Sequence, residues 1–246
     1  MTKLFSNNIN FLNLYKKPSN KSEIVTQMIY GDTFSISKKT GKWLKIKIKE
    51  DGYKGYIKNQ RYSTYFKPNY KVNVLKASVY KFPNYRKKIY ELTFGSKLKV
   101  SSSKAKFLKF SKGWVKKNEV KPIRYKEKNV FGKITIFKNI KYKWGGKTFK
   151  GIDCSALIQV FLNFNNRYCP RDTKDQVKYF KKNIKLKNIM KNDIIFWKGH
   201  VALALSKKKL IHAYGPKKKT IIMDINKTIK KIKETANLRV IGIKRV

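Results

Sequence analysis

One cysteine and two histidines are the residues of this chain best suited to nucleophilic chemistry. Cys154 follows Asp153 and precedes an almost unbroken apolar run over residues 156–162. Residues 151–173 contain no lysine, in a chain with 61 lysines and arginines of which seven are arginine. Burial explains this gap, because an unpaired charge is costly to bury. The pattern predicts a buried helix with Asp153 as its N-cap. A helix N-terminus favours thiolate over thiol, so Cys154 is a candidate nucleophile.

The only two histidines, His200 and His212, flank a predicted β-hairpin. Residues 201–205 alternate large and small apolar side chains, and residues 210–214 form a second apolar run after a short polar turn. A hairpin centred on Ser206 makes the two histidines direct cross-strand partners, with Cβ atoms about 4.5–5.5 Å apart on one face. A register slip of one residue would separate them.

These three residues could form a nucleophile, a base and a group that orients the base. Cys154 would be the nucleophile, held as a thiolate by the helix terminus and an adjacent imidazolium. His200 would act as general base and then as general acid, and His212 would orient His200 through the second ring nitrogen. The arrangement requires the start of the cysteine helix to meet the hairpin, which spacing alone does not establish.

Other segments of the C-terminal half must position these residues. Residues 142–146 form a turn whose two glycines allow close backbone approach just before the cysteine helix. Asp172 is the predicted N-cap of a second, amphipathic helix, and residues 193–197 have the length and composition of a buried strand. Residues 131–137 fit either a strand or part of a helix.

The first 120 residues contain two copies of one pattern of short strands. The copies are offset by 65 residues at their prolines, Pro18 and Pro83, and by 64 at their first central glycines, Gly31 and Gly95. Short alternating strands separated by Gly and Pro predict small all-β barrels. A polar, lysine-rich connection follows at residues 121–129. The chain is therefore predicted to contain three domains, at residues 1–66, 67–124 and 125–246.

The composition indicates attraction to polyanions without identifying one. The formal charge is +48, with only 13 acidic residues. Such a charge leaves open contact with an anionic wall polymer or another polyanion. Arginine, which nucleic-acid surfaces favour for base and phosphate contacts, is scarce, which argues against nucleic acid as the main partner. An AT-rich coding sequence would also enrich lysine, but it would enrich glutamate as well.

No segment predicts a membrane span or a secretion signal. No window approaches eighteen uncharged apolar residues. The first fourteen residues lack an apolar run followed by a small-residue cleavage site, so the expected location is the cytoplasm.

The two cysteines and two histidines do not have the spacing of a metal site. Cys154 and Cys169 are fifteen residues apart, and the histidines are twelve apart, unlike the short paired spacings of zinc ligands. No metal or other cofactor is therefore expected. A Cys154–Cys169 disulfide is not expected in a reducing compartment.

Several motifs of the C-terminal half together resemble the NlpC family of papain-like cysteine peptidases. They are Tyr-x-Trp-Gly-Gly, Gly-x-Asp-Cys-Ser, Pro-Arg-Asp-x-x-x-Gln, Asp-Ile-Ile-Phe-Trp, His-Val-Ala-Leu and Ile-His-Ala, in that order over residues 125–246. The resemblance implies an α+β fold in which a buried helix with an N-terminal cysteine packs on an antiparallel sheet. It also implies the catalytic triad Cys154, His200 and His212, with Tyr142 beside the nucleophile to bind substrate or oxyanion.

The two N-terminal repeats resemble bacterial Src-homology-three-like domains, and with the NlpC region they resemble γ-D-glutamyl-L-diamino-acid endopeptidases. This resemblance implies hydrolysis of muropeptides that begin L-alanyl-γ-D-glutamyl, between the D-glutamate and the diamino acid. It implies a first barrel that closes one end of the cleft, so that a free L-alanine amine is required.

The same resemblance implies substrate-binding roles for particular residues. Asp153 would pair with the alanine amine, with Tyr53 of the first barrel also reaching it, while Glu50 or Asp51 could add a second carboxylate. For Asp153 and Asp172 the alternative role is plain N-capping. The predicted lining of the D-glutamate pocket is Ser155, Arg171, Asp172 and Thr173.

Three functions stay open from the sequence. The first is a cytoplasmic peptidase that recycles murein peptides, which the missing signal sequence favours. The second is a wall-lytic hydrolase that acts on intact peptidoglycan. The third is a non-catalytic protein that binds the wall or another polyanion, against which the intact Cys154, His200 and His212 argue.

Overall fold

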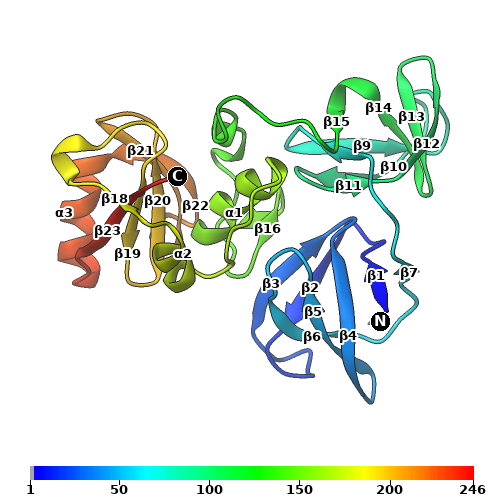
Figure 1. The fold of residues 1–246 in the computed structure, drawn as a ribbon, viewed down its shortest axis with the longest axis horizontal. Coiled ribbons are helices and arrows are strands. Elements are labelled where there is room, and N and C mark those ends of the chain that lie inside the picture. The colour runs from blue at the N-terminus through cyan, green and yellow to red at the C-terminus, as the bar shows by residue number, and fades with distance from the viewer. Residues whose placement is uncertain (1–2) are drawn as a thin grey trace.

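The computed structural model describes residues 3–246, which form three consecutive units that meet at a common junction (Figure 1). Two all-β units, the first barrel (residues 3–66) and the second barrel (residues 67–124), precede an α+β unit at residues 125–246, here called the catalytic domain. This combination confirms the predicted fold class.

The first barrel is a seven-stranded sheet whose alternation of side chains follows the sequence. In the segment Trp43–Ile48, Leu44, Ile46 and Ile48 are buried while the intervening lysines are exposed, as the period of two in a strand requires. The strands pair in the order β3-β2-β6-β5-β4-β1-β7. Their bounds are β1 (Leu4–Ser6), β2 (Phe11–Tyr15), β3 (Ile24–Ile29), β4 (Thr33–Thr40), β5 (Trp43–Ile48), β6 (Lys54–Lys58) and β7 (Ser63–Thr64).

The second barrel repeats part of this arrangement in two smaller sheets. The sheets have the orders β10-β9-β14-β13-β12 and β11-β8-β15, so β9, β13 and β14 take the sequence positions that β2, β5 and β6 hold in the first copy. The elements are β8 (Tyr70–Val72), β9 (Lys76–Tyr80), β10 (Lys88–Thr93), β11 (Lys97–Leu98), β12 (Val100–Lys104), β13 (Phe107–Phe110), β14 (Gly113–Lys116), the 3-10 helix η1 (Lys117–Glu119) and β15 (Val120–Pro122).

The catalytic domain is built on a six-stranded antiparallel sheet with a helix on each face. Helix α1 (Cys154–Phe164) packs on one face of β20 and β21, against Val201, Leu203 and Ile211. Helix α3 (Ile225–Ala236) covers the other face, and the two helices lie on opposite sides of the sheet in Figure 1. The strand order is β18-β23-β19-β20-β21-β22, with β18 (Lys182–Asn183), β19 (Ile194–Trp197), β20 (His200–Ala204), β21 (Lys209–Tyr214), β22 (Lys219–Asp224) and β23 (Val240–Arg245).

Short elements fill the remaining connections of the catalytic domain. Residues 131–137, which the sequence left between strand and helix, contain a single 3-10 turn, η2 (Ile134–Phe137). The second predicted helix is α2 (Thr173–Tyr179), with Asp172 at its N-cap position. The other elements are β16 (Lys147–Thr148), β17 (Gly151–Ile152), η3 (Leu186–Asn188) and η4 (Gly215–Lys217).

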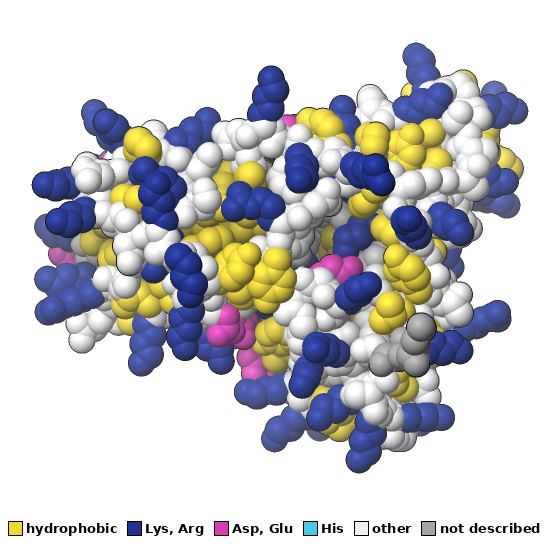
Figure 2. Space-filling view, viewed as in Figure 1, with side chains coloured by type: hydrophobic (Ala, Val, Ile, Leu, Met, Phe, Trp, Pro, Cys, Tyr) yellow, Lys and Arg dark blue, Asp and Glu magenta, His cyan; other side chains and the backbone are white. Residues whose placement is uncertain are grey.

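Basic side chains are spread over the surface. Figure 2 shows Lys and Arg on all three units, with acidic side chains at only a few places in this view. This face therefore offers no single basic patch. None of the helices within residues 3–246 is long and apolar enough to cross a membrane.

The second barrel shares a core with the catalytic domain through Phe94, which follows β10. Its ring lies 4.8 Å from that of Phe161 and 4.6 Å from that of Phe164, both on α1. Phe94 is 1% exposed and belongs to the same apolar cluster as Cys154. The second barrel therefore supports the helix that carries the candidate nucleophile.

We expect Phe94→Ala to lower the free energy of unfolding by about 3–5 kcal/mol, because it leaves a cavity among aromatic rings of two units. Urea denaturation followed by circular dichroism measures this loss. The control is Phe82→Ala, a change at a ring that is 47% exposed on the same barrel, which should shift stability by no more than about 0.5 kcal/mol. Equal, small losses in both variants would contradict a shared core.

Candidate active site

Cys154 is the first residue of α1, as the sequence predicted. Asp153 is the N-cap, and its carboxylate accepts a hydrogen bond from the backbone N–H of Ala156 at 2.8 Å. Helix α1 packs against β20, and the backbone N–H of Val201 in that strand acts to lower the pKa of the Cys154 thiol. Because Val201 follows His200 in β20, the start of the helix meets the start of the histidine strand.

The two histidines come together, but not as direct cross-strand partners. Strand β21 pairs with β20 in a register that places Leu203 opposite Ile211 and Ala204 opposite Leu210. The hairpin is therefore centred on residue 207 instead of Ser206, which shifts the pairing of the two strands by two residues. His200 and His212 are diagonal neighbours as a result. They stay on one face because a shift by an even number preserves the alternation. Nε2 of His200 lies 2.9 Å from Nδ1 of His212.

A tight turn fixes His200 at the beginning of its strand. Trp197 pairs with His200 across a two-residue turn formed by Lys198 and Gly199. Gly199 has φ +75°, a left-handed conformation that glycine adopts without strain and that such turns require. The ring of His200 packs 5.6 Å from that of Trp197, which limits its rotation.

The partners of His212 determine which ring nitrogens carry protons. Nε2 of His212 lies 3.4 Å from the sulfur of Met223, and a thioether can only accept. The proton of His212 is therefore assigned to Nε2, so Nδ1 of that ring is the acceptor for Nε2–H of His200. This leaves Nδ1 of His200 as a free lone pair, as a general base requires.

Burial keeps both the thiol and the imidazoles neutral, which corrects the expected thiolate–imidazolium pair. Burial, together with the neighbouring Asp153, raises the pKa of Cys154 to about 12, although the N–H of Val201 partly opposes this rise. Burial lowers the pKa of His200 to about 4. Burial and the proximity of His200 lower the pKa of His212 to about 3. Desolvation thus outweighs the helix terminus in the resting site.

A cavity of about 450 Å³ opens onto the cysteine. Its wall includes Cys154 and all of the predicted substrate residues except Tyr142. Residues of the first barrel, of the turn before α1 and of the β19–β20 turn complete it. The lining is Lys16, Glu23, Val25, Tyr53, Trp144, Asp153, Cys154, Ser155, Arg171, Asp172, Thr173, Lys174, Lys198 and Gly199.

Asp153 is engaged by the protein on every side. Arg171 donates to both carboxylate oxygens, at 3.0 and 2.5 Å. The backbone N–H of Gly145 donates at 2.9 Å and the hydroxyl of Ser155 at 3.2 Å, in addition to the capping bond from Ala156. Only 5% of Asp153 is exposed. The structural role of this carboxylate is therefore larger than the N-cap that the sequence predicted. It has no acceptor site left for an amine.

Asp172, in contrast, faces Tyr53 across the cavity wall. The Tyr53 hydroxyl donates to Asp172 at 3.2 Å, and among residues 3–246 no other group donates a hydrogen bond to this carboxylate. Although Asp172 occupies the N-cap position of α2, its side chain forms no capping bond. Burial raises the pKa of Asp172. Burial and Asp172 also raise the pKa of Tyr53, which keeps the phenol protonated as a donor.

Glu50 and Asp51, the two carboxylates that the resemblance left open for the amine site, do not line this cavity. Glu50 accepts from the N–H of Thr33 and from the Nζ of Lys97 at 2.6 Å. Asp51 accepts from Gln159 and from the N–H of Tyr53. Glu23, which the sequence reasoning did not single out, lines the cavity and accepts from the indole N–H of Trp144 at 2.8 Å. Its position depends on the packing of two units, so no local pattern indicates it.

Tyr142 lies beside the nucleophile without lining the cavity. Burial and the nearby Cys154 and Asp153 raise the pKa of its phenol, which therefore remains a donor. Both cysteines are free and buried. Within the described residues, no group of three or more metal-binding side chains is placed to hold an ion.

A cysteine at the start of a buried helix that packs on the strand of a histidine pair has the elements of a cysteine peptidase site. Residues 139–239 match the NlpC/P60 family, and residues 14–61 match the bacterial dipeptidyl-peptidase Sh3 domain. The chain therefore contains an NlpC/P60 domain, the cysteine peptidase domain of that family, behind a bacterial SH3 domain.

Curated relatives and solved structures are similar over most of the chain. A γ-D-glutamyl-L-lysine dipeptidyl-peptidase of Bacillus subtilis is 23% identical and covers 84% of this chain and 77% of its own. One of Bacillus cereus is also 23% identical, over 85% and 72%. The crystal structure of an NlpC/P60 family protein from Bacillus cereus has a TM-score of 0.82 at 19% identity, covering 98% of this chain and 99% of that one.

The lowered pKa of His200 predicts activity in mild acid. The base is lost only when His200 is protonated, and its pKa has moved from 6.5 to about 4. We therefore expect kcat/KM to persist as the pH falls from 7 to 5 and to be lost as it falls through about 4. A pH profile on a soluble peptide substrate measures the acid limb. An apparent pKa close to 6.5 on that limb would contradict a desolvated base.

The tautomer assignment predicts different losses for two changes at His212. His212→Asn can retain an oxygen that accepts from Nε2–H of His200, whereas His212→Ala cannot. We expect His212→Ala to lower kcat by about 10²- to 10⁴-fold and His212→Asn to retain at least about ten times more activity than His212→Ala. Single-turnover kinetics with matched thermal melts measures both. Equal losses in two folded variants would contradict an acceptor role for His212.

Proposed function

We propose that the protein is a cysteine endopeptidase that hydrolyses the γ-D-glutamyl–diamino acid bond of muropeptides with a free N-terminal L-alanine. The observation that carries this proposal is the contact of Tyr53 with Asp172. Both residues line the cavity that contains Cys154, so the contact places in its wall a carboxylate with room for a further donor. The names of the two Bacillus relatives support the same bond class.

The amine-binding role passes from Asp153 to Asp172 in this proposal. An alanine ammonium needs acceptors, and the acceptor sites of Asp153 are filled by Arg171 and by backbone N–H groups. Within residues 3–246, the Asp172 carboxylate accepts only from the neutral phenol of Tyr53, and burial raises the pKa of Asp172. A cation beside Asp172 would therefore find an incompletely satisfied carboxylate, whose charge it would stabilise.

The chemical steps follow from the assigned protons. As the thiol sulfur attacks the scissile carbonyl, its proton moves to Nδ1 of His200, so two neutral groups become reactive without a standing ion pair. The backbone N–H of Cys154 and the phenol of Tyr142 would donate to the developing oxyanion. His200 then protonates the leaving amine of the diamino acid. Water, activated by the same imidazole, hydrolyses the thioester and restores the thiol.

Released peptides fit this cleft better than the intact wall. In intact peptidoglycan the alanine amine is acylated, so it carries no charge for Asp172 and needs space beyond the contact with Tyr53. We therefore favour recycling of murein peptides, with a cytoplasmic location as part of the proposal. The second candidate is wall lysis, which the high positive charge of the surface favours.

The test compares three substrates: L-Ala-γ-D-Glu-diaminopimelate, its N-acetylated form and intact sacculi. We expect cleavage of the free tripeptide, a decrease in kcat/KM of at least about 10²-fold on acetylation because a charged hydrogen bond is lost and its partner is left buried, and no release from sacculi. Mass spectrometry of the products identifies the bond. Cys154→Ala is the inactive control. Equal rates on the free and acetylated peptides would refute the closed cleft, and release from sacculi would establish wall lysis.

A further inference from the structure

We propose that Asp51 is a positioning residue that ties Tyr53 to the catalytic helix and thereby sets the preference for a free substrate amine. This inference rests on the proposed function, because Tyr53 acts at the amine-binding end of the cavity. Within the described residues, the hydrogen bond from the backbone N–H of Tyr53 is the only one that joins Asp51 to the lining of that cavity.

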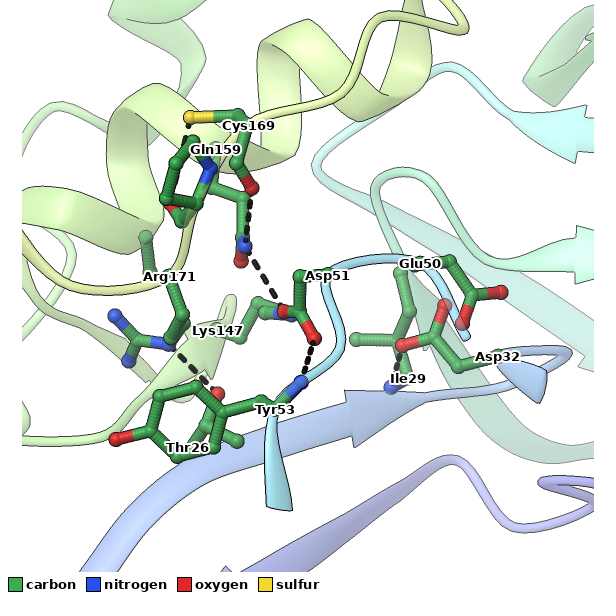
Figure 3. A network of polar contacts seen from close by, with 12 residues as sticks. Thr26, Ile29, Asp32, Glu50, Asp51, Tyr53, Lys147, Gln159, Cys169 and Arg171 are labelled. Atoms are coloured by element: carbon green, nitrogen blue, oxygen red, sulfur yellow. Dashed lines mark hydrogen bonds and ion pairs between the residues drawn. The ribbon is translucent and has the colours of Figure 1, made fainter. Parts of the chain in front are cut away.

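Asp51 connects two units with both of its oxygens. Its Oδ1 accepts from the backbone N–H of Tyr53 at 3.0 Å, and its Oδ2 accepts from Nε2 of Gln159 at 3.0 Å. Figure 3 shows the carboxylate between these two donors, with Lys147 beside it. Nζ of Lys147 lies 3.9 Å from Oδ2. The side chain of Asp51 is fully buried, so water does not replace these partners.

Gln159 makes this connection a rigid one. It lies in α1, five residues after Cys154, and is fully buried. Its Nε2 also donates to the carbonyl of Cys169 at 3.0 Å, which fixes the amide from a second side. The position of the Tyr53 backbone is therefore set relative to the helix that carries the nucleophile.

Tyr53 links the hydrogen bond at its backbone to a contact of its side chain in the cavity. Its hydroxyl reaches Asp172, while its own N–H is held by Asp51 only two residues earlier. A charge-assisted hydrogen bond is stronger than a neutral one, so Asp51 holds the loop more firmly than an amide would. The distance between the amine site and Cys154 thus depends on a link that passes through Asp51.

The neighbouring carboxylate, Glu50, binds a different unit from Asp51, which makes it a matched control. Glu50 is adjacent in sequence and accepts from Lys97 of the second barrel at 2.6 Å. It makes no hydrogen bond to the catalytic domain within the described residues. Removal of its charge disturbs the same turn and a buried ion pair without breaking the link from Asp51 to Gln159.

The experiment measures kcat and KM for the free and the N-acetylated tripeptide in wild type, Asp51→Asn, Gln159→Leu and Glu50→Gln. We expect Asp51→Asn and Gln159→Leu to raise KM for the free tripeptide by about 10- to 100-fold, since small displacements in a positioned site have effects of this size. The kcat value should change little, and the ratio of kcat/KM between the two substrates should decrease. Glu50→Gln should keep the wild-type ratio.

A merely structural role would have a different signature. Loss of folded enzyme lowers the rates on both substrates by the same factor and leaves the ratio and KM unchanged, which would overturn the proposal. So would a wild-type ratio in both Asp51→Asn and Gln159→Leu. Equal loss of the ratio in Glu50→Gln would show that the whole turn, and not Asp51, sets the preference.

Hydrogen–deuterium exchange tests the link without relying on activity. In Asp51→Asn and Gln159→Leu, the peptide that contains Tyr53 should exchange faster than in wild type, while peptides from β22 and α3 should not change. If wild type cleaves neither tripeptide, the proposed function fails, but the exchange result still tests the link from Tyr53 through Asp51 to Gln159. Unchanged exchange at Tyr53 in both variants would refute it.

Discussion

The buried ion pair between Asp153 and Arg171 is the interaction on which the site depends. Burial of two charges is favourable only when their remaining hydrogen-bonding groups are satisfied, and here every nitrogen of the Arg171 guanidinium and both oxygens of Asp153 have hydrogen-bond partners. Arg171 also donates to Thr26 of the first barrel at 2.6 Å and to Ser155 at 2.8 Å. Asp153 holds the turn before α1 through Gly145. One pair thus fixes the start of the nucleophile helix, the residue after the nucleophile and the first barrel.

The same burial that makes this pair strong determines the protonation of the catalytic residues. Cys154 and His200 lie where charge is costly, so the resting site contains a thiol and a neutral imidazole. A neutral base needs its free lone pair on the correct nitrogen. The contacts of His212 with Met223 and with His200 determine that this nitrogen is Nδ1 of His200. The sulfur of Met223 can only accept a hydrogen bond, so it favours the tautomer of His212 that is protonated on Nε2. A donor at the same place would favour the other tautomer.

Local patterns predicted the elements of the site, whereas contacts between distant segments decided the roles. The cysteine helix and its Asp153 cap follow from a short stretch of sequence, and the shared face of the histidines survives the register error because the slip was even. The register itself depends on the turn at residues 206–208, whose geometry the sequence does not specify. Arg171 occupies Asp153, which is why the proposal gives the amine role to Asp172. No pattern within one segment indicates which of two carboxylates an arginine will bind.

Both barrels belong to the framework of the catalytic helix. At the C-terminal end of α1, Lys71 of the second barrel donates to the carbonyls of Phe164 and Tyr125, and its Nζ lies 4.6 Å from the centre of the Phe164 ring. Burial lowers the pKa of Lys71 to about 8, and the carbonyls at the helix end, where the dipole is negative, offset part of that cost. The first barrel holds the opposite end of α1 through Thr26 and Arg171. Each end of the nucleophile helix is thus held by contacts with a different barrel. His200 lies on the sheet of the catalytic domain, which takes part in neither set of contacts, so displacement of either barrel would move Cys154 relative to His200.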